Sequence, residues 1–153
     1  MRYSYIRPFM EAARDILEQM LPGGVVTGDV CLAPPSIVSR GVVSIVGITG
    51  ETQGRVLFDM APEAALAIAG AMNGETLSEL GSLGQDTLSE LASMIAGRAV
   101  SILNDEGHRL KSSPPTLLMG ERLTISNTEL ETLVVPVRTS CGEVVVNVAI
   151  TTS

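Results

Sequence analysis

The stretch from Pro62 to Gly74 limits most strongly what this chain can fold into. It is predicted to be a helix, because Pro62 suits a first helical turn and Asn73–Gly74 is a typical left-handed helix end. The body of the helix reads EAALAIAGAM and carries a single charge, that of Glu63. A helix with apolar and small residues all round must be covered on most of its sides. We therefore expect it to pack on a sheet or at a subunit contact.

The remaining pattern of apolar residues predicts two further helices and a series of strands. The helices are expected from Ile6 to Met20 and from Gln85 to Asn104, with Gly107 ending the second. The β-rich segments are 25–32, 42–49, 55–60, 116–119, 122–125, 130–138 and 144–151, and the connections 50–54 and 139–143 are expected to be hairpins. The order α-β-β-β-α-α-β-β-β-β favours an α/β (α+β) domain, with a mainly antiparallel sheet and helices packed on it.

Length and composition exclude several classes of protein. A chain of 153 residues favours one domain spanning 1–153. No apolar stretch reaches the roughly 18–20 residues that span a bilayer, and the first residues do not resemble a secretory signal, so we expect a cytoplasmic protein. A net charge of −7 and the absence of Trp make nucleic acid and anionic membranes poor partners. One His and two Cys favour no metal site, with Cys31 and Cys141 reduced and packed inside.

The helix expected over 85–104 carries the clearest functional signal. On a helical wheel its core stripe consists of Leu88, Ala92, Ile95, Ala99, Ile102 and Leu103. The opposite side carries Glu90, Ser93, Met94, Gly97, Ser101 and Asn104. A solvated face normally favours long charged or polar side chains, whereas this one has small residues around one carboxylate. Gly97 costs about 1 kcal/mol relative to alanine in a helix interior, and it lets another surface come close to the backbone.

Two interpretations of this side are open. In the first it is a docking face, with Glu90 as a charged anchor, Ser93 as a polar group one turn on, and a bare patch at Gly97. In the second it is purely structural. The sequence Thr87-Leu88-Ser89-Glu90 fits a capping box if the helix begins at Thr87, and Gly97 would then pack against another element of the same chain.

At these residues the chain resembles the CheC/CheX/FliY family of chemotaxis phosphatases. Residues 89–99 read SELASMIAGRA, where the family pattern is Glu-x-x-Asn with a Gly four residues after the Asn. Agreement continues through 43–50, 64–74 and 113–116, with Gly120 beyond. CheC-type members usually carry a second such motif near the N-terminus, but here 11–14 read EAAR, so the CheX branch is the closer match. The resemblance implies a three-layer CheC/CheX-like fold, one site per chain, and a homodimer joined through its sheets.

The resemblance also implies an activity. Members of this kind bind a phosphorylated CheY-type response regulator and promote hydrolysis of its aspartyl phosphate. The regulator holds Mg²⁺ and most of the catalytic groups, so no cofactor is expected in this chain. In the family the Glu pairs with a lysine of the regulator and the Asn amide holds the attacking water. Glu90 and Ser93 occupy these catalytic positions, and Glu90, Met94 and Gly97 are the expected partner contacts.

Ser93 is a departure from the family motif. A serine hydroxyl ends roughly 1.3 Å short of an asparagine amide oxygen, and a misplacement of about 1 Å costs on the order of a hundredfold in rate. We therefore expect weaker hydrolysis than the family motif would give. One alternative is a catalytically silent binding and dimerisation module that sequesters or localises a regulator. Another is a structural dimerisation domain without a regulator partner.

Overall fold

The computed structural model describes residues 2–127 and 130–151. The helices are α1 (Arg2–Met20), α2 (Pro62–Asn73) and α3 (Ser82–Asp105). The strands are β1 (Val26–Thr27), β2 (Cys31–Leu32), β3 (Ser36–Val38), β4 (Val42–Gly50), β5 (Gly54–Met60), β6 (Leu110–Ser112), β7 (Thr116–Met119), β8 (Thr124–Ser126), β9 (Leu130–Thr139) and β10 (Gly142–Thr151). No helix among the described residues is long and apolar enough to cross a membrane.

The strands form one large sheet and one small one. The large sheet has the order β1-β9-β10-β5-β4-β6, with β2 also pairing with β9 and β7 with β4. The small sheet consists of β3 and β8, and every strand pairing of the described residues is antiparallel. In the middle of the large sheet Val146 lies opposite Phe58 on one neighbour and Val135 on the other. The last long strand of the chain therefore sits at the centre of the sheet.

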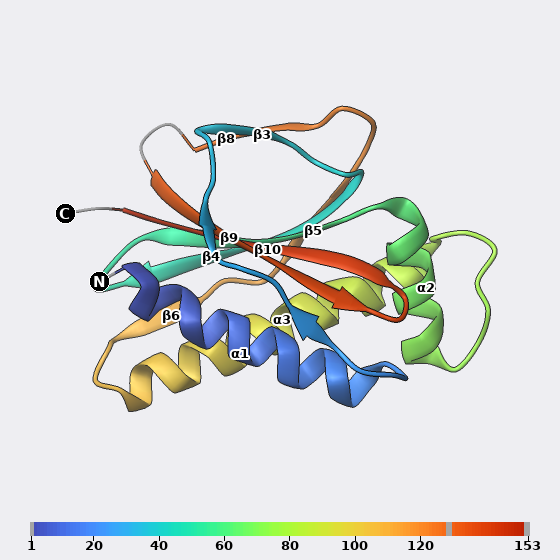
Figure 1. Ribbon diagram of the computed structural model, residues 1–153, viewed down its shortest axis with the longest axis horizontal. Helices are drawn as coiled ribbons and strands as arrows, with labels where there is room; N and C mark the ends of the chain where they lie inside the picture. The colour runs from blue at the N-terminus through green and yellow to red at the C-terminus, as the bar shows by residue number, and fades with distance from the viewer. Residues whose placement is uncertain (1, 128–129, 152–153) are drawn as a thin grey trace.

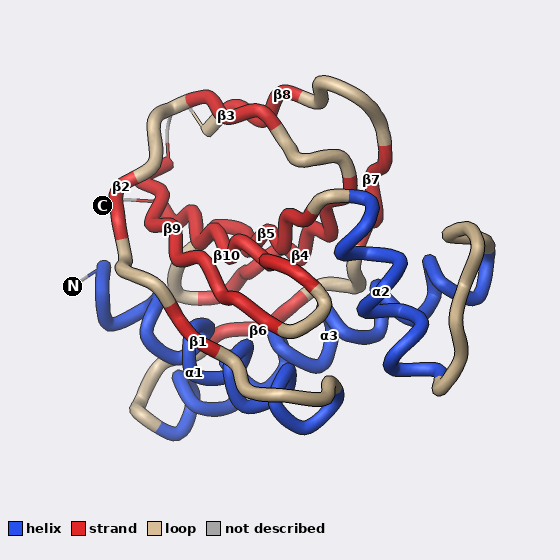
Figure 2. The backbone as a smooth tube through the Cα atoms, turned by 45° about the vertical axis from the view of Figure 1, so that its right-hand side comes forward, coloured by secondary structure: helices blue, strands red, loops and turns tan. Residues whose placement is uncertain are grey.

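The sheet lies between two covering layers. Helices α1 and α3 run side by side across one face, and the β3–β8 pair lies over the other (Figure 1). Figure 2 shows the same separation from another side. Successive side chains of a strand point to opposite faces of the sheet, and this explains the layers. The side chains on one face pack with the helices in the main core, and those on the other face form a smaller cluster around Val43, Leu57 and Ile125. The expected three-layer α+β architecture is confirmed.

Helix α3 buries the predicted stripe but begins three residues earlier than expected. Leu88, Ala92, Ile95, Ala99 and Leu103 are buried, and Ile102 is partly exposed. In this added first turn, a Cβ on Gly84 would lie 2.7 Å from Leu80 Cδ1. The absence of a side chain thus lets the preceding loop pack closely against the first turn of the helix.

Several other expectations need correction. Helix α2 has the predicted bounds and a left-handed Gly74 at its end, but only five of its twelve residues are buried, so it is not covered on most sides. The segment expected as one strand over 25–32 forms the two short strands β1 and β2. Strands β3 and β6 were not expected. Both cysteines are free, but Cys31 is exposed on β2 and only Cys141 is partly buried.

Candidate functional site

The predicted functional side of α3 lies on the surface of the molecule. Glu90, Ser93, Ser101 and Asn104 are exposed, and Met94 and Gly97 are partly exposed; we call this set the α3 outer face. At 1.5 Å rise per residue, Glu90 and Gly97 lie about 10 Å apart along the helix axis. The helix therefore brings all the residues predicted for catalysis and partner contact onto one accessible strip.

The capping-box interpretation of Glu90 is wrong. The helix begins at Ser82 after the N-cap residue Gly81, so Thr87 lies inside the helix. The Thr87 hydroxyl donates a hydrogen bond of 2.9 Å to the Leu83 carbonyl and accepts one of 2.8 Å from Asn73 Nδ2. Glu90 lies too far along α3 to satisfy an amide of its first turn.

The Glu90 carboxylate and the Ser93 hydroxyl are free to meet an external group. Neither side chain makes a hydrogen bond or ion pair with any residue in the part of the chain that the structure describes. Because the Glu90 carboxylate has no described partner in the chain, an opposite charge on a docked protein can pair with it without first breaking an internal ion pair. Ser93 lies one turn along on the same side of the helix.

Gly97 does not pack closely against another element of the described chain. A Cβ built on Gly97 would meet no heavy atom within 4 Å, so the interpretation that Gly97 packs against another element of the chain is wrong. Its backbone φ is not among the positive values found at other glycines. An alanine would therefore fit here in both space and conformation. The glycine instead leaves the backbone accessible between Ser93 and Ser101.

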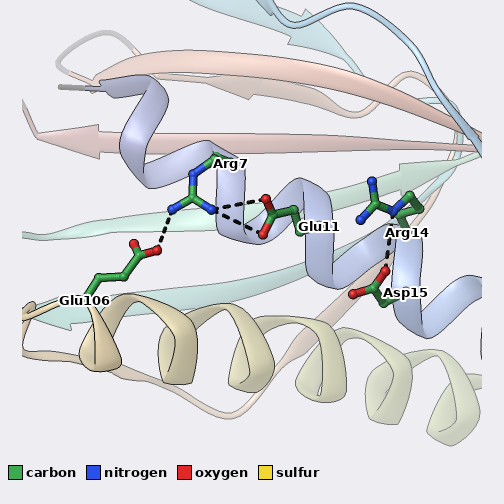
Figure 3. A network of polar contacts seen from close by, with 5 residues as sticks. All are labelled: Arg7, Glu11, Arg14, Asp15 and Glu106. Atoms are coloured by element: carbon green, nitrogen blue, oxygen red, sulfur yellow. Dashed lines mark hydrogen bonds and ion pairs between the residues drawn. The ribbon is translucent and has the colours of Figure 1, made fainter.

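Ion pairs fasten α1 beside α3. Arg7 Nη2 lies 2.6 Å from Glu106 Oε2, and Arg7 Nη1 lies 3.1 Å from Glu11 Oε1 (Figure 3). The hydrogen bonds to Glu106 and Glu11 raise the pKa of the Arg7 guanidinium. The Glu11 carboxylate, in the N-terminal segment that reads EAAR, is thus already engaged within the chain.

A second ion-pair cluster lies next to Gly97. Asp15 Oδ1 is 3.4 Å from Arg14 Nε (Figure 3), and Asp15 Oδ2 is 3.7 Å from Arg98 Nη2. Arg7, early in α1, pairs with Glu106 after the end of α3, whereas Asp15, later in α1, pairs with Arg98 in the middle of α3. The two helices are therefore antiparallel. Sequence reasoning missed this cluster, because it depends on the alignment of two helices distant in the chain.

Asn104 differs from the other members of the α3 outer face because its side chain is engaged. Its Oδ1 accepts a hydrogen bond of 2.9 Å from the Leu110 amide, and its Nδ2 donates one of 3.1 Å to the Leu110 carbonyl. This pairing ties the end of α3 to β6. Asn104 therefore has a structural role, and the accessible part of the face runs from Glu90 to Ser101.

The Glu51 carboxylate links the turn between β4 and β5 to α1 and to the segment that follows α3; we call this contact the carboxylate brace. Glu51 Oε2 lies 3.0 Å from His108 Nδ1 and accepts a hydrogen bond of 3.4 Å from the Tyr5 hydroxyl. The hydrogen bond from His108, followed by that from the Arg109 amide, holds the pKa of Glu51 below its ordinary value. The described residues contain no group of three or more His, Cys, Asp and Glu placed to hold a metal ion. The brace is therefore best understood as a structural contact.

Comparisons with known proteins agree with the resemblance seen in the sequence. The family model described as "Chemotaxis phosphatase CheX" matches residues 42–138, which include the whole α3 outer face. The CheY-P phosphatase CheX of Thermotoga maritima is 31% identical over 99 residues, covering 61% of this chain and 64% of that protein. The match thus spans less than two thirds of the relative's length.

Solved structures share the fold over nearly the whole chain. A chemotaxis protein CheX from Desulfovibrio desulfuricans has a TM-score of 0.86 and 26% identity, covering 96% of this chain and 99% of that one. The CheX–CheY–BeF3–Mg²⁺ complex from Borrelia burgdorferi gives a TM-score of 0.85 and 33% identity, covering 97% of this chain and 98% of the matched one.

Proposed function

Because the chain belongs to the CheX family of chemotaxis phosphatases, we propose that it binds a phosphorylated CheY-type response regulator through the part of the α3 outer face from Glu90 to Gly97. One observation carries the proposal: the free carboxylate of Glu90 lies one turn from Ser93, on a strip that is bare at Gly97. The B. burgdorferi complex supports it, since that relative binds a CheY.

Glu90 acts as the anchor of the complex. Its carboxylate is exposed and without an ion pair among the described residues, so a lysine of the regulator's active site can approach it directly. Met94 adds an apolar contact beside it, and Gly97 allows the two backbones to come close. Recognition then rests on this local fit, because a chain with net charge −7 gives an acidic regulator no long-range attraction.

Ser93 orients the attacking water. Its hydroxyl both donates and accepts hydrogen bonds, as this role requires. In the reaction the water oxygen bonds to phosphorus, the bond from phosphorus to the aspartyl oxygen breaks, and the regulator's carboxylate leaves. The hydroxyl falls roughly 1.3 Å short of the reach of an asparagine, which corresponds to a rate lower by about a hundredfold. The Mg²⁺ ion belongs to the regulator, and this chain lends one side chain to a site that is otherwise complete.

The test is release of inorganic phosphate from a phosphorylated CheY-type receiver, measured together with binding. We expect slow release by the unmodified chain, loss of binding and release in Glu90→Ala, and an increase in rate of about a hundredfold in Ser93→Asn. Ser101→Asn is the matched control, because it places the same amide two turns farther along the same face and should leave the rate unchanged. An unchanged rate in Ser93→Asn would show that position 93 does not face the water.

A second candidate function is a catalytically silent module that binds the regulator and dimerises. It is favoured by Ser93 and by the exposed edge strand β7, where Leu118 and Met119 are 41% and 47% exposed. A second copy adding its own strand there would cover these side chains. This candidate predicts tight binding without phosphate release, and a dimer in sedimentation equilibrium that Leu118→Lys dissociates. A monomeric chain that binds no regulator would refute both candidates.

A further inference from the structure

We propose that Arg98 is a second charged contact for the regulator, so that the docking surface carries opposite charges at two points. This inference rests on the proposed function and adds a feature of the partner to it. Glu90 takes a cation of the regulator, and Arg98 takes a carboxylate on the part of the regulator that lies toward α1.

Arg98 shares its described carboxylate partner with Arg14. Asp15 provides the only described ion-pair partner of both Arg14, at 3.4 Å, and Arg98, at 3.7 Å. Two guanidinium groups thus share one carboxylate. Arg98 therefore has no carboxylate of its own among the described ion pairs, although the chain has ten basic and seventeen acidic residues.

The contact between Arg98 and Asp15 is weak enough to be exchanged. The Arg98 and Asp15 side chains are 43% and 37% exposed, and their separation of 3.7 Å is long for an ion pair. Arg7 is the opposite case, since it lies 2.6 Å from Glu106 and 3.1 Å from Glu11 and is held on two sides. Arg98 can therefore turn toward an incoming carboxylate, whereas Arg7 stays with its partners.

The position of Arg98 suits a contact at the rim of the docked surface. Arg98 follows Gly97 and is rotated from it by about 100° around the helix, toward α1. Along the helix axis it lies about 12 Å from Glu90. A regulator that covers the face from Glu90 to Gly97 therefore reaches Arg98 at the edge of that face, on the side toward α1.

A second charged contact restricts the orientation of the regulator further. Glu90, Met94 and Gly97 lie along one strip of α3, and Arg98 adds a contact to the side of that strip, toward α1. The same contact discriminates between regulators, because one with a basic group at that point would be repelled.

The experiment measures affinity for a CheY-type receiver loaded with BeF3⁻ and Mg²⁺, at low and at high salt. We expect Arg98→Gln to weaken binding about 3- to 5-fold at low salt, and Arg98→Glu to weaken it tenfold or more, with both effects smaller at high salt. Arg14→Gln is the matched control, because it removes the same charge from the same Asp15 cluster but lies on α1; it should change the affinity by less than about twofold. Unfolding curves of the three variants should coincide with that of the unmodified chain.

The outcomes separate this inference from the function on which it rests. Binding by the unmodified chain that neither Arg98→Gln nor Arg98→Glu alters would refute the role of Arg98 and leave the proposed function standing. Equal losses in Arg98→Gln and Arg14→Gln would show a general effect of charge and refute a direct contact. If the unmodified chain binds no receiver, the proposed function fails and the inference fails with it. Restoration of Arg98→Glu binding by an acidic-to-basic change on the receiver would identify the partner residue.

Discussion

Replacing Gly97 by alanine should make the protein more stable and less able to bind its partner. A glycine inside a helix costs about 0.5–1 kcal/mol relative to alanine, because it loses more backbone freedom on folding. The added methyl group would meet no heavy atom of the chain within 4 Å, so no clash offsets the gain. We expect the free energy of unfolding to rise by up to about 1 kcal/mol, and Tm by roughly 2–4 °C for a chain of this size.

The effect on docking has the opposite sign. If the regulator's surface lies against the bare backbone, the methyl group must be accommodated within a packed contact. Inserting such a group typically costs about 1–3 kcal/mol, which corresponds to roughly 5- to 150-fold in Kd. Urea unfolding and titration of a BeF3⁻-loaded receiver measure the two quantities on the same sample.

Ser101→Ala serves as the control for helix propensity. It also introduces alanine on the α3 outer face, but it removes atoms instead of adding them, so it should stabilise the helix slightly without weakening binding. A lower stability of Gly97→Ala would show that the site is packed within the chain. Normal binding by Gly97→Ala would show that the bare patch is not part of the interface.

Two further predictions concern the fold. Because the folded-state pKa of Glu51 is lowered, chiefly by its hydrogen bond to His108, its contribution to stability is present above the ordinary value of 4.5 and is lost as the pH falls below it. Glu51→Gln should therefore lose less stability than the unmodified chain between neutral and about pH 3 in urea unfolding, and parallel pH profiles would contradict this. Thr87→Val removes the acceptor of the 2.8 Å hydrogen bond from Asn73 Nδ2 and should lower the free energy of unfolding by about 1 kcal/mol. Thr87→Ser keeps the hydroxyl and should lose less; an equal loss would assign the effect to packing.

Elements with a strong local pattern could be predicted, and those made by tertiary pairing could not. Helix α2 was predicted close to its observed bounds, because Pro62 and Asn73–Gly74 mark its two ends. Strands β3 and β6 are three residues long and have no alternation that a sequence can reveal; their partners, β8 and β4, define them. The start of α3 at Ser82 was not predicted, because the expected helix began at Gln85.

The candidate site likewise has features that the sequence predicts and features that depend on tertiary packing. The exposure of Glu90 and Ser93 follows from helical periodicity, and the structure places both as expected. The capping-box alternative depended on where α3 begins, which local sequence did not determine. The ion pair between Asp15 and Arg98 depends on the axial position of α1 relative to α3. That alignment is set by the packing of both helices on the sheet, which the sequence pattern does not show.

The central position of β10 has a consequence for the newly made chain. Strands β5 and β9 both pair with β10, which comes after them in the sequence, and they do not pair with each other. During synthesis, β4 and β5 can form a hairpin early, but its β5 edge stays open until residues 142–151 have left the ribosome. An open edge that carries Val56 and Phe58 invites pairing with other chains. The β5 edge is thus open to other chains for the interval before β10 emerges, and we expect a synonymous change that slows translation before residue 142 to increase aggregation.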